Sequence, residues 1–298
     1  MHLEPHHHVG RRARHARCHR EVRSRGALRV SRLKDLPPGV ARVLWLGATL
    51  FWAVQLSLYL LGGLSLLDTI LLATLLIAIP ALAIAQVPLA QEALIERLPA
   101  YWSSIATLWV LGTISWLVGT RTEGLAAIGL TLLPPVPFIA WTLGLTAAGL
   151  GIIVVFRQVA LGLRVRESPL LRSLLPRTAE ERGVFAILSL AAGVGEEVAY
   201  RGYAIPVLIP VVGSVGALLL TSAVFGVLHV YQGTLGIFRT AVMGATLAGG
   251  FLLSGSLLPA IIAHTAIDLL AGILIADKLL LPLNSHGVGG VDETLQES

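Results

Sequence analysis

The sequence predicts an all-α fold: a polytopic transmembrane helical bundle of about eight spans, with the active site within the last four. Of its 298 residues, 55% are hydrophobic and only 13% are charged, and the mean hydropathy is +0.79. Ordinary soluble domains are considerably more charged. The chain also contains several apolar runs of roughly 20 residues, the helical length that crosses a bilayer core of about 30 Å. Helices suit such runs because they satisfy their own backbone polar groups in lipid.

Eight apolar runs form the expected spans, and prolines mark several of their boundaries. Pro80 lies inside the second run and is expected to kink it. Pro135 opens the fourth run, where proline is tolerated. Residues 203–213 contain two prolines and are expected to form a broken or interfacial piece. The expected spans are 41–62, 66–88, 102–119, 135–156, 183–202, 214–232, 237–253 and 257–276.

The distribution of basic residues orients the chain and divides it. Residues 1–42 hold ten arginines and one lysine, and residues 157–182 hold six arginines. Because basic loops stay in the cytoplasm, we expect both termini on the cytoplasmic side of a bacterial cytoplasmic membrane. Asp68, at a span end, is expected to be solvated. The expected division is a basic disordered cytoplasmic tail (1–40), N-terminal transmembrane helices (41–156), a basic cytoplasmic or interfacial segment (157–182), the catalytic transmembrane core (183–276) and a polar tail (277–298).

The cysteine content and the net charge exclude several classes of protein. The single cysteine, Cys18, excludes an intramolecular disulfide and an all-cysteine metal site. A net charge of +5 is compatible with nucleic-acid binding, but the arginines are concentrated beside the spans. We therefore expect membrane lipid, and no nucleic acid, as a partner of the basic segments.

Three polar clusters interrupt the apolar sequence of the last four spans. They are EEVAYRG at 196–202, FGVLH at 225–229 and HTAID at 264–268. An ionisable side chain at membrane depth costs roughly 2.5–3.5 kcal/mol on insertion scales, so such residues normally face each other or a wet cavity and mark function. The clusters are therefore the expected functional site.

Helical spacing indicates how these side chains pair. Glu197 and Arg201 are four residues apart and share a helix face, so they are expected to form a neutralising ion pair. Glu196 is turned about 100° from its neighbour and remains available for chemistry. His264 and Asp268 are also four apart, and a carboxylate at that distance can orient an imidazole ring.

Glu196, His229 and His264 are expected to converge, because the 35 residues between the two histidines return the chain to a similar depth. Two imidazoles and one carboxylate are a ligand set for catalytic Zn²⁺, which keeps one position open for water. Without a metal, the same three residues suit a glutamate base that activates water, with an imidazole as its partner. The sequence leaves both versions open.

The three motifs together resemble the signature of the CAAX prenyl endopeptidase and bacteriocin-processing family of intramembrane proteases (CPBP, also called Abi). That signature is Glu-Glu-x-x-x-Arg, then Phe-x-x-x-His, then His-x-x-x-Asn or Asp. Here the motifs occur in this order within about residues 175–275, and the last position is Asp268. Any one motif alone is weak evidence, but the ordered set is specific.

The resemblance implies a role for each matching residue. Glu196 corresponds to the glutamate that activates water, with the help of His229. His264 and Asp268 correspond to the pair placed near the scissile carbonyl, and the remaining acid and arginine to a supporting pair. The implied catalytic set is Glu196, Glu197, Arg201, His229, His264 and Asp268.

The leading function is therefore an intramembrane endopeptidase, a hydrolase that cleaves membrane-associated protein or peptide substrates with water activated by Glu196. Two alternatives remain. One is a non-catalytic membrane scaffold or bacteriocin self-immunity protein that keeps the fold, and its phenotype would survive the loss of Glu196. The other is a proton or metal transporter, against which the sequence shows neither an inverted repeat nor paired broken helices.

Overall fold

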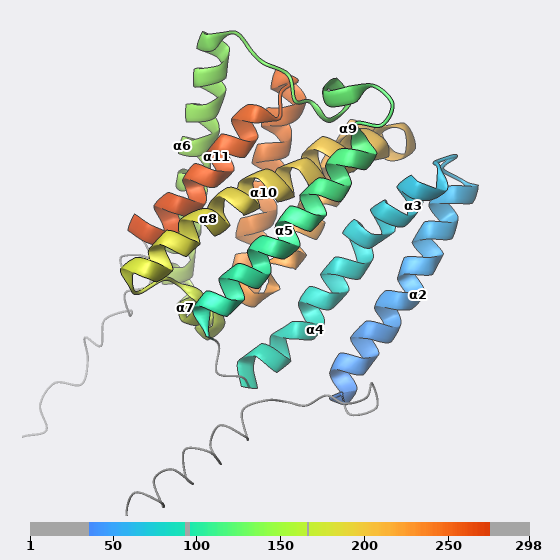
Figure 1. Ribbon diagram of the computed structural model, residues 1–298. Coiled ribbons are helices and arrows are strands. Elements are labelled where there is room, and N and C mark those ends of the chain that lie inside the picture. Colours follow the sequence, from blue (N-terminus) through green and yellow to red (C-terminus); the bar gives the residue numbers. More distant parts are fainter. Residues whose placement is uncertain (1–35, 93–95, 166, 275–298) are drawn as a thin grey trace, which may run out of the picture.

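A computed structural model of the chain describes residues 36–92, 96–165 and 167–274. Within these ranges all regular structure is helical, which confirms the all-α prediction there (Figure 1). The predicted tails at 1–40 and 277–298 lie almost wholly outside the described residues. In chain order the elements are α2 (Pro38–Leu60), α3 (Leu66–Ala73), η2 (Thr74–Ala78), α4 (Ile79–Glu92), α5 (Arg97–Gly119), η3 (Gly124–Ile128), α6 (Pro135–Gly162), α7 (Pro169–Leu174), α8 (Ala179–Glu196), η4 (Glu197–Ala204), α9 (Ile205–Leu228), η5 (Val230–Gln232), α10 (Thr234–Ser254), α11 (Leu258–Leu269) and η6 (Leu270–Leu274).

The second predicted span is a single helical run made of α3, η2 and α4, and it packs beside α2 at one side of the bundle (Figure 1). Ser65 caps its start, because the Ser65 hydroxyl accepts a hydrogen bond from the backbone N–H of Asp68 at 3.1 Å. The element η2 is a π-helical turn, and it ends two residues before Pro80. The helix is therefore irregular at the point where the sequence predicts a kink.

Local sequence signals also mark the residues at which two later helices, α6 and α8, begin. The helix α6 begins at Pro135, as predicted. The helix α8 begins with a capping box, in which the Thr178 hydroxyl accepts from the Glu181 N–H and the Glu181 carboxylate accepts from the Thr178 N–H. Between them, the predicted basic segment 157–182 contains the end of α6 and the short helix α7, and its location at the membrane surface stays a prediction.

The fifth and sixth predicted spans are the two legs of a helical hairpin. Residues 179–228 form one apolar helical run, but Gly213 within it has φ 72° and ψ 167°, a conformation open essentially to glycine alone. In a straight helix, Tyr200 and Phe225 would lie about 37 Å apart at 1.5 Å per residue. Their ring centroids are instead 6.0 Å apart, so the chain folds back close to Gly213.

The expected break at 203–213 is present at its last residue, Gly213, whereas the rest of this stretch is helical. Pro206 lies in the first turn of α9, where a missing N–H is tolerated. Pro210 lies inside the helix, which membrane helices accommodate more readily than soluble ones. The break is at Gly213 rather than at either proline.

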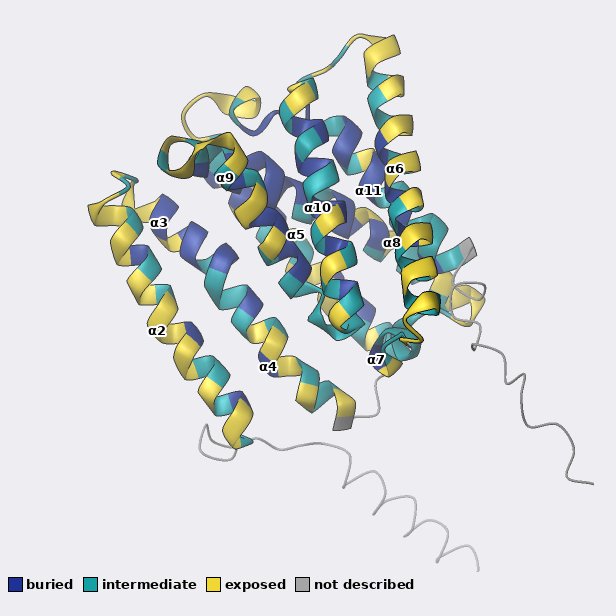
Figure 2. Cartoon of the chain, turned by 180° about the vertical axis from the view of Figure 1, so that it is seen from behind, coloured by how far each residue is buried: buried dark blue, intermediate teal, exposed yellow. Residues whose placement is uncertain are grey.

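The surface of the bundle is apolar, as expected for a multi-pass integral membrane protein. Large apolar side chains such as Trp45, Trp52 and Leu253 are exposed on its outside, and exposed positions line the outer faces of α2 and α6 (Figure 2). Within the described residues, six helices are long and apolar enough to cross a membrane. One of these six is the hairpin at 179–228, and the shorter helix at 258–273 is not among them.

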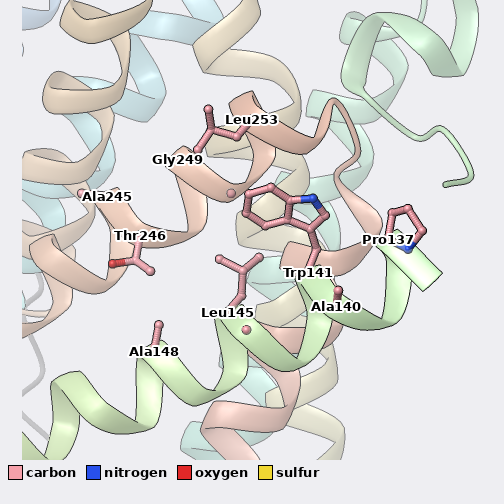
Figure 3. Close-up of a pocket in the computed structure, with 11 residues that line it drawn as sticks. Pro137, Ala140, Trp141, Leu145, Ala148, Ala245, Thr246, Gly249 and Leu253 are labelled. Carbon is pink, nitrogen blue, oxygen red and sulfur yellow. The ribbon is translucent and has the colours of Figure 1, made fainter. Parts of the chain in front are cut away.

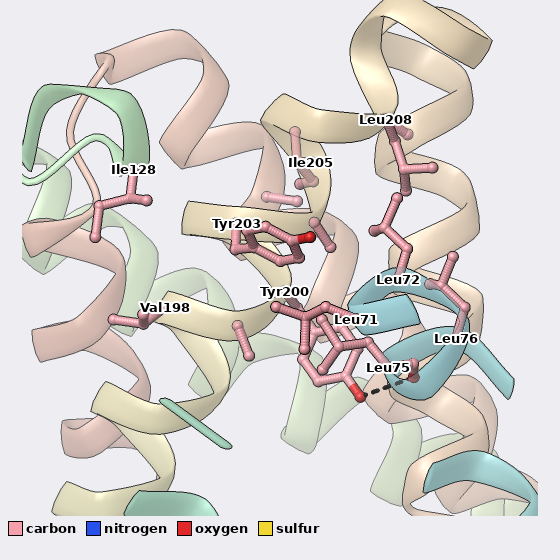
Figure 4. Packing of buried hydrophobic residues seen from close by; sticks show 14 of the residues in the cluster. Leu71, Leu72, Leu75, Leu76, Ile128, Val198, Tyr200, Tyr203, Ile205 and Leu208 are labelled. Carbon is pink, nitrogen blue, oxygen red and sulfur yellow. Dashed lines mark hydrogen bonds between the residues drawn. The ribbon is translucent and has the colours of Figure 1, made fainter. Parts of the chain in front are cut away.

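The main core packs α3 and η2 against η4 and the first turn of α9 (Figure 4). Leu72, Tyr200, Tyr203 and Ile205 are all essentially inaccessible there. The central π-helical element η4 therefore lies inside the protein, with the N-terminal helices on one side. The helix α11 packs between α6 and α8 and completes the other side.

Candidate active site

The three sequence motifs lie on three packed elements in the C-terminal part of the bundle. Glu196 ends α8 and Glu197 begins η4, a π-helical stretch of the kind that often occurs at functional sites. His229 follows the last residue of α9. His264 and Asp268 lie one turn apart in α11. The hairpin at Gly213 brings the first two motifs together, and the packing of α11 against α8 adds the third.

The predicted ion pair between Glu197 and Arg201 is present in the structure. Arg201 Nη1 donates to Glu197 Oε1 at 2.9 Å, and both side chains are almost completely buried. Arg201 Nη2 also donates to the carbonyl of Gly244 in α10 at 3.1 Å. The guanidinium lies over the ring of Phe225 at 4.3 Å, a cation–π contact. The arginine is thus held by charge, by a backbone carbonyl and by an aromatic face.

Glu197 also binds His264, a contact that the sequence analysis missed. His264 Nδ1 lies 2.8 Å from Glu197 Oε1, the same oxygen that accepts from Arg201. The two residues are 67 positions apart, so no spacing rule relates them. The carboxylate fixes the orientation of the imidazole ring and makes Nδ1 its donor nitrogen. The sequence had given this orienting role to Asp268.

The other ring nitrogen of His264 faces two further carboxylates. Its Nε2 lies 3.8 Å from Glu196 Oε2 and 3.6 Å from Asp268 Oδ2. Both distances are too long for a direct hydrogen bond and suit a bridging water. Glu196 Oε2 is buried and has no hydrogen-bond partner among the described residues. A buried acceptor without a partner calls for a water or a substrate group.

The cluster becomes more exposed from one end to the other. The side chain of Glu197 is 0% exposed and that of His264 8%, whereas Glu196 is 15% and Asp268 38% exposed. Glu197, which is paired with Arg201, is therefore at the buried end of the cluster, and Asp268 is at its exposed end. A small polar molecule entering past Asp268 would meet Glu196 and His264 together.

His229 reaches this group through Phe225. Its Nδ1 donates to the carbonyl of Phe225 at 2.9 Å, and its ring packs against the rings of Phe225 and Tyr231. The Phe225 ring centroid lies 4.9 Å from that of His229 and 5.9 Å from that of His264. Phe225 therefore packs against both imidazole rings of the trio that the sequence expected to converge.

This arrangement does not fit the predicted zinc site. Glu196 and His264 are close, but in the part of the chain that the structure describes no group of three or more His, Cys, Asp or Glu residues is placed so as to hold a metal ion. The bond from His229 Nδ1 to a carbonyl leaves only Nε2 for a metal, and the ring of Phe225 packs against both imidazoles. We therefore derive no step through a metal.

A second polar cluster lies at the end of the bundle where α3 begins. Asp68 is buried there, which corrects the expectation that it is solvated. It pairs with Arg121, and it accepts from the Ser65 hydroxyl at 2.6 Å and from the Tyr203 hydroxyl at 3.0 Å. Its partners come from positions as far as 135 residues away, which is why the sequence gave no sign of them.

A surface hollow lies between α6 and α10 (Figure 3), and none of the residues of the two polar clusters lines it. Its volume is about 550 Å³, and small and apolar side chains such as Gly144, Trp141 and Leu145 line it. None of its lining residues is acidic or basic. It has the character of a lipid-facing surface, and we place the chemistry at the acid–histidine cluster instead.

The fold and this cluster define a multi-pass helical membrane protein with a buried acid–histidine centre. Residues 178–270 match the protein family described as type II CAAX prenyl endopeptidase, Rce1-like. The matching segment covers about a third of the chain and contains all three motifs, so the resemblance inferred from them is confirmed. Comparisons with curated proteins and with solved structures found no match.

Proposed function

We propose that the protein is an intramembrane endopeptidase that hydrolyses peptide bonds of membrane-associated proteins or peptides. The observation that carries this proposal is that Glu196 Oε2, which has no hydrogen-bond partner among the described residues, lies 3.8 Å from His264 Nε2. A water molecule to the side of these two atoms would contact both a base and an imidazole. The family match supports the reaction class, because its members are endopeptidases by description.

The reaction proposed for this geometry has two proton transfers. Glu196 takes a proton from the water as the water oxygen attacks the carbonyl carbon of the substrate. Protonated His264 donates a hydrogen bond from its Nε2–H to the oxyanion that forms and keeps its proton. The C–N bond then breaks, and the proton held by Glu196 passes to the leaving amine. Glu197 holds the imidazole in place throughout, and Arg201 balances the charge of Glu197.

We further propose eight membrane crossings with both termini in the cytoplasm. The hairpin at Gly213 contributes two crossings, and the shorter helix at 258–273 contributes the last. Two ion pairs, Arg97 with Glu181 and Arg239 with Glu167, join residues that the positive-inside pattern puts on the cytoplasmic side. A C-terminal reporter that scores as extracytoplasmic would contradict this topology.

The decisive experiment replaces Glu196 by Gln, which keeps the size of the side chain and removes the base. Membrane peptides from cells with the wild type and with Glu196→Gln are compared by mass spectrometry. We expect the variant to remain abundant in the membrane and to lose the cleavage products, since general-base catalysis is worth about 10²–10⁴ in rate.

The same experiment separates the alternatives. An unchanged phenotype and peptide pattern in Glu196→Gln would favour a scaffold or self-immunity protein over a protease. Flux of protons or metal ions in liposomes that depends on Glu196 would favour a transporter. Stoichiometric zinc in the purified, active protein would restore the metal version, which involves Glu196, His229 and His264.

A further inference from the structure

The π-helical element η4 makes polar contacts on two different faces. Glu197 and Arg201 on one face make the ion pair of the active site. Tyr200 and Tyr203 make their hydrogen bonds on another side, towards the N-terminal helices (Figure 4). Both tyrosine side chains are at most 1% exposed. One short segment of chain is thus attached to two parts of the protein at once.

The tyrosine hydroxyls bind anchors in α3 and η2. Tyr200 Oη donates to the backbone carbonyl of Leu75 at 3.2 Å, a bond that joins the two π-helical stretches η2 and η4 (Figure 4). Tyr203 Oη donates to Asp68 Oδ1 at 3.0 Å. Asp68 is itself held by Ser65 and Arg121, so it is a fixed acceptor. Both bonds cross between the N-terminal helices and the segment that carries the catalytic motif.

The same tyrosines are connected to the reacting groups by aromatic packing. The ring of Tyr200 meets that of Phe225 edge to face, with centroids 6.0 Å apart. Phe225 in turn lies beneath Arg201 and against His264. A shift of η4 would therefore move Glu197 and, through its hydrogen bond, the imidazole of His264.

We infer that the segment Leu66–Ala78 of the N-terminal helices is a positioning element of the active site, and that Tyr203 and Tyr200 are its positioning residues. The inference deepens the proposed function and rests on it, because only that function makes this cluster an active site. It gives a role to a part of the chain outside the segment 178–270 that matches the protease family. The hydroxyls of these tyrosines hold η4 so that Glu196, Glu197 and His264 keep the spacing described above.

The test uses the full-length protein in proteoliposomes and the variant Tyr203→Phe, which removes one hydroxyl and keeps the ring. The matched control is Tyr101→Phe. Tyr101 is equally buried, and its hydroxyl donates to the carbonyl of Leu174, between α5 and α7. Each variant loses one buried hydrogen bond to an acceptor on another element, so a general loss of stability should be similar in both.

Hydrogen exchange of the backbone amides of residues 196–204, followed by mass spectrometry, reads the position of η4 without any need for activity. We expect faster exchange of this peptide in Tyr203→Phe and no change in Tyr101→Phe. Equal exchange in the two variants would overturn the inference. Because this readout does not depend on cleavage, it decides the positioning role even if the wild type proves inactive and the proposed function fails.

Kinetics supply the second readout, with a synthetic peptide made from a cleavage product identified in the wild-type membranes. We expect Tyr203→Phe to lower kcat by about ten- to hundredfold with little change in KM, because small misplacement of catalytic groups acts on the chemical step. Tyr101→Phe should keep the wild-type kcat per folded molecule. A wild-type kcat in Tyr203→Phe, or an equal loss in both variants, would overturn the inference.

Discussion

Among the residues that the structure describes, two acid–arginine pairs have a buried carboxylate, and they are built differently. Asp68 and Arg121 join α3 to the turn after α5 at one end of the bundle, and the arginine side chain is 36% exposed. Glu197 and Arg201 lie within one element in the interior, and neither is accessible. The first carboxylate is satisfied by two hydroxyl donors as well as by the arginine. The second shares one oxygen between Arg201 and His264 and leaves its other oxygen without a partner among the described residues.

This difference separates a structural polar cluster from one that is arranged for chemistry. Groups that are fully bonded hold elements together and have no capacity left for another molecule. At the inner cluster, Glu196 and Glu197 each keep one buried oxygen that has no hydrogen-bond partner within the described part of the chain, next to a histidine. Such incomplete bonding is costly in the interior and is expected where a water or substrate completes the site.

The largest effect on stability is expected from breaking the inner pair. Glu197→Gln leaves Arg201 charged and without its carboxylate in a buried site, which typically costs about 3–5 kcal/mol. That is a large part of a stability of about 5–15 kcal/mol. Arg201→Met should be similarly damaging, yet the double variant should recover part of the loss, because both charges are then removed. Melting temperatures of the detergent-solubilised wild type, both single variants and the double variant measure this.

Glu196→Gln is the matched control for that series, because Glu196 and Glu197 are adjacent and chemically identical. We expect its melting temperature to stay close to that of the wild type, since Glu196 Oε2 has no hydrogen-bond partner among the described residues and lies 3.8 Å from His264 Nε2. If Glu196→Gln melts much lower and Glu197→Gln does not, the roles of the two glutamates are reversed.

A smaller effect is expected from breaking the outer pair. Arg121→Met removes a partly exposed cation, whose interaction solvent screens, and Asp68 keeps its bonds to Ser65 and Tyr203. We expect a loss of about 1 kcal/mol or less, the range of exposed ion pairs. The same melting experiment measures it. A drop in melting temperature as large as that of Glu197→Gln would show that the two pairs contribute equally to stability despite their different burial.

The sequence predicted the features of the fold that depend on composition and local signals. The lengths of the apolar runs predicted the helical bundle, and Pro135 marked the start of α6. It placed a break within 203–213 but did not single out Gly213, because a glycine among apolar residues looks like any other small residue until its backbone angles are known. The sequence attributed that break to the two prolines of the stretch, although the packed helix accommodates both.

The candidate site was predictable to the extent that its contacts are local. The pair of Glu197 and Arg201 follows from their spacing of four. The bond from Glu197 to His264 and the bond from Tyr203 to Asp68 join residues 67 and 135 positions apart, and only the packing of the helices decides them. The sequence predicted that His229 and His264 lie at a similar depth, but it gave no sign that the ring of Phe225 packs against both, because depth in the membrane does not determine which side chains meet.

The bend at Gly213 has a consequence for how the first two motifs must be spaced in any chain built this way. Tyr200 and Phe225 lie at nearly equal distances along the sequence on either side of the glycine, so the interval between the motifs is twice the length of one hairpin leg. One residue inserted into a single leg would raise Phe225 by about 1.5 Å and turn it by about 100° away from Tyr200. The number of residues in each leg is therefore fixed by the register of the hairpin, and a length change confined to one leg between 201 and 225 is incompatible with the site.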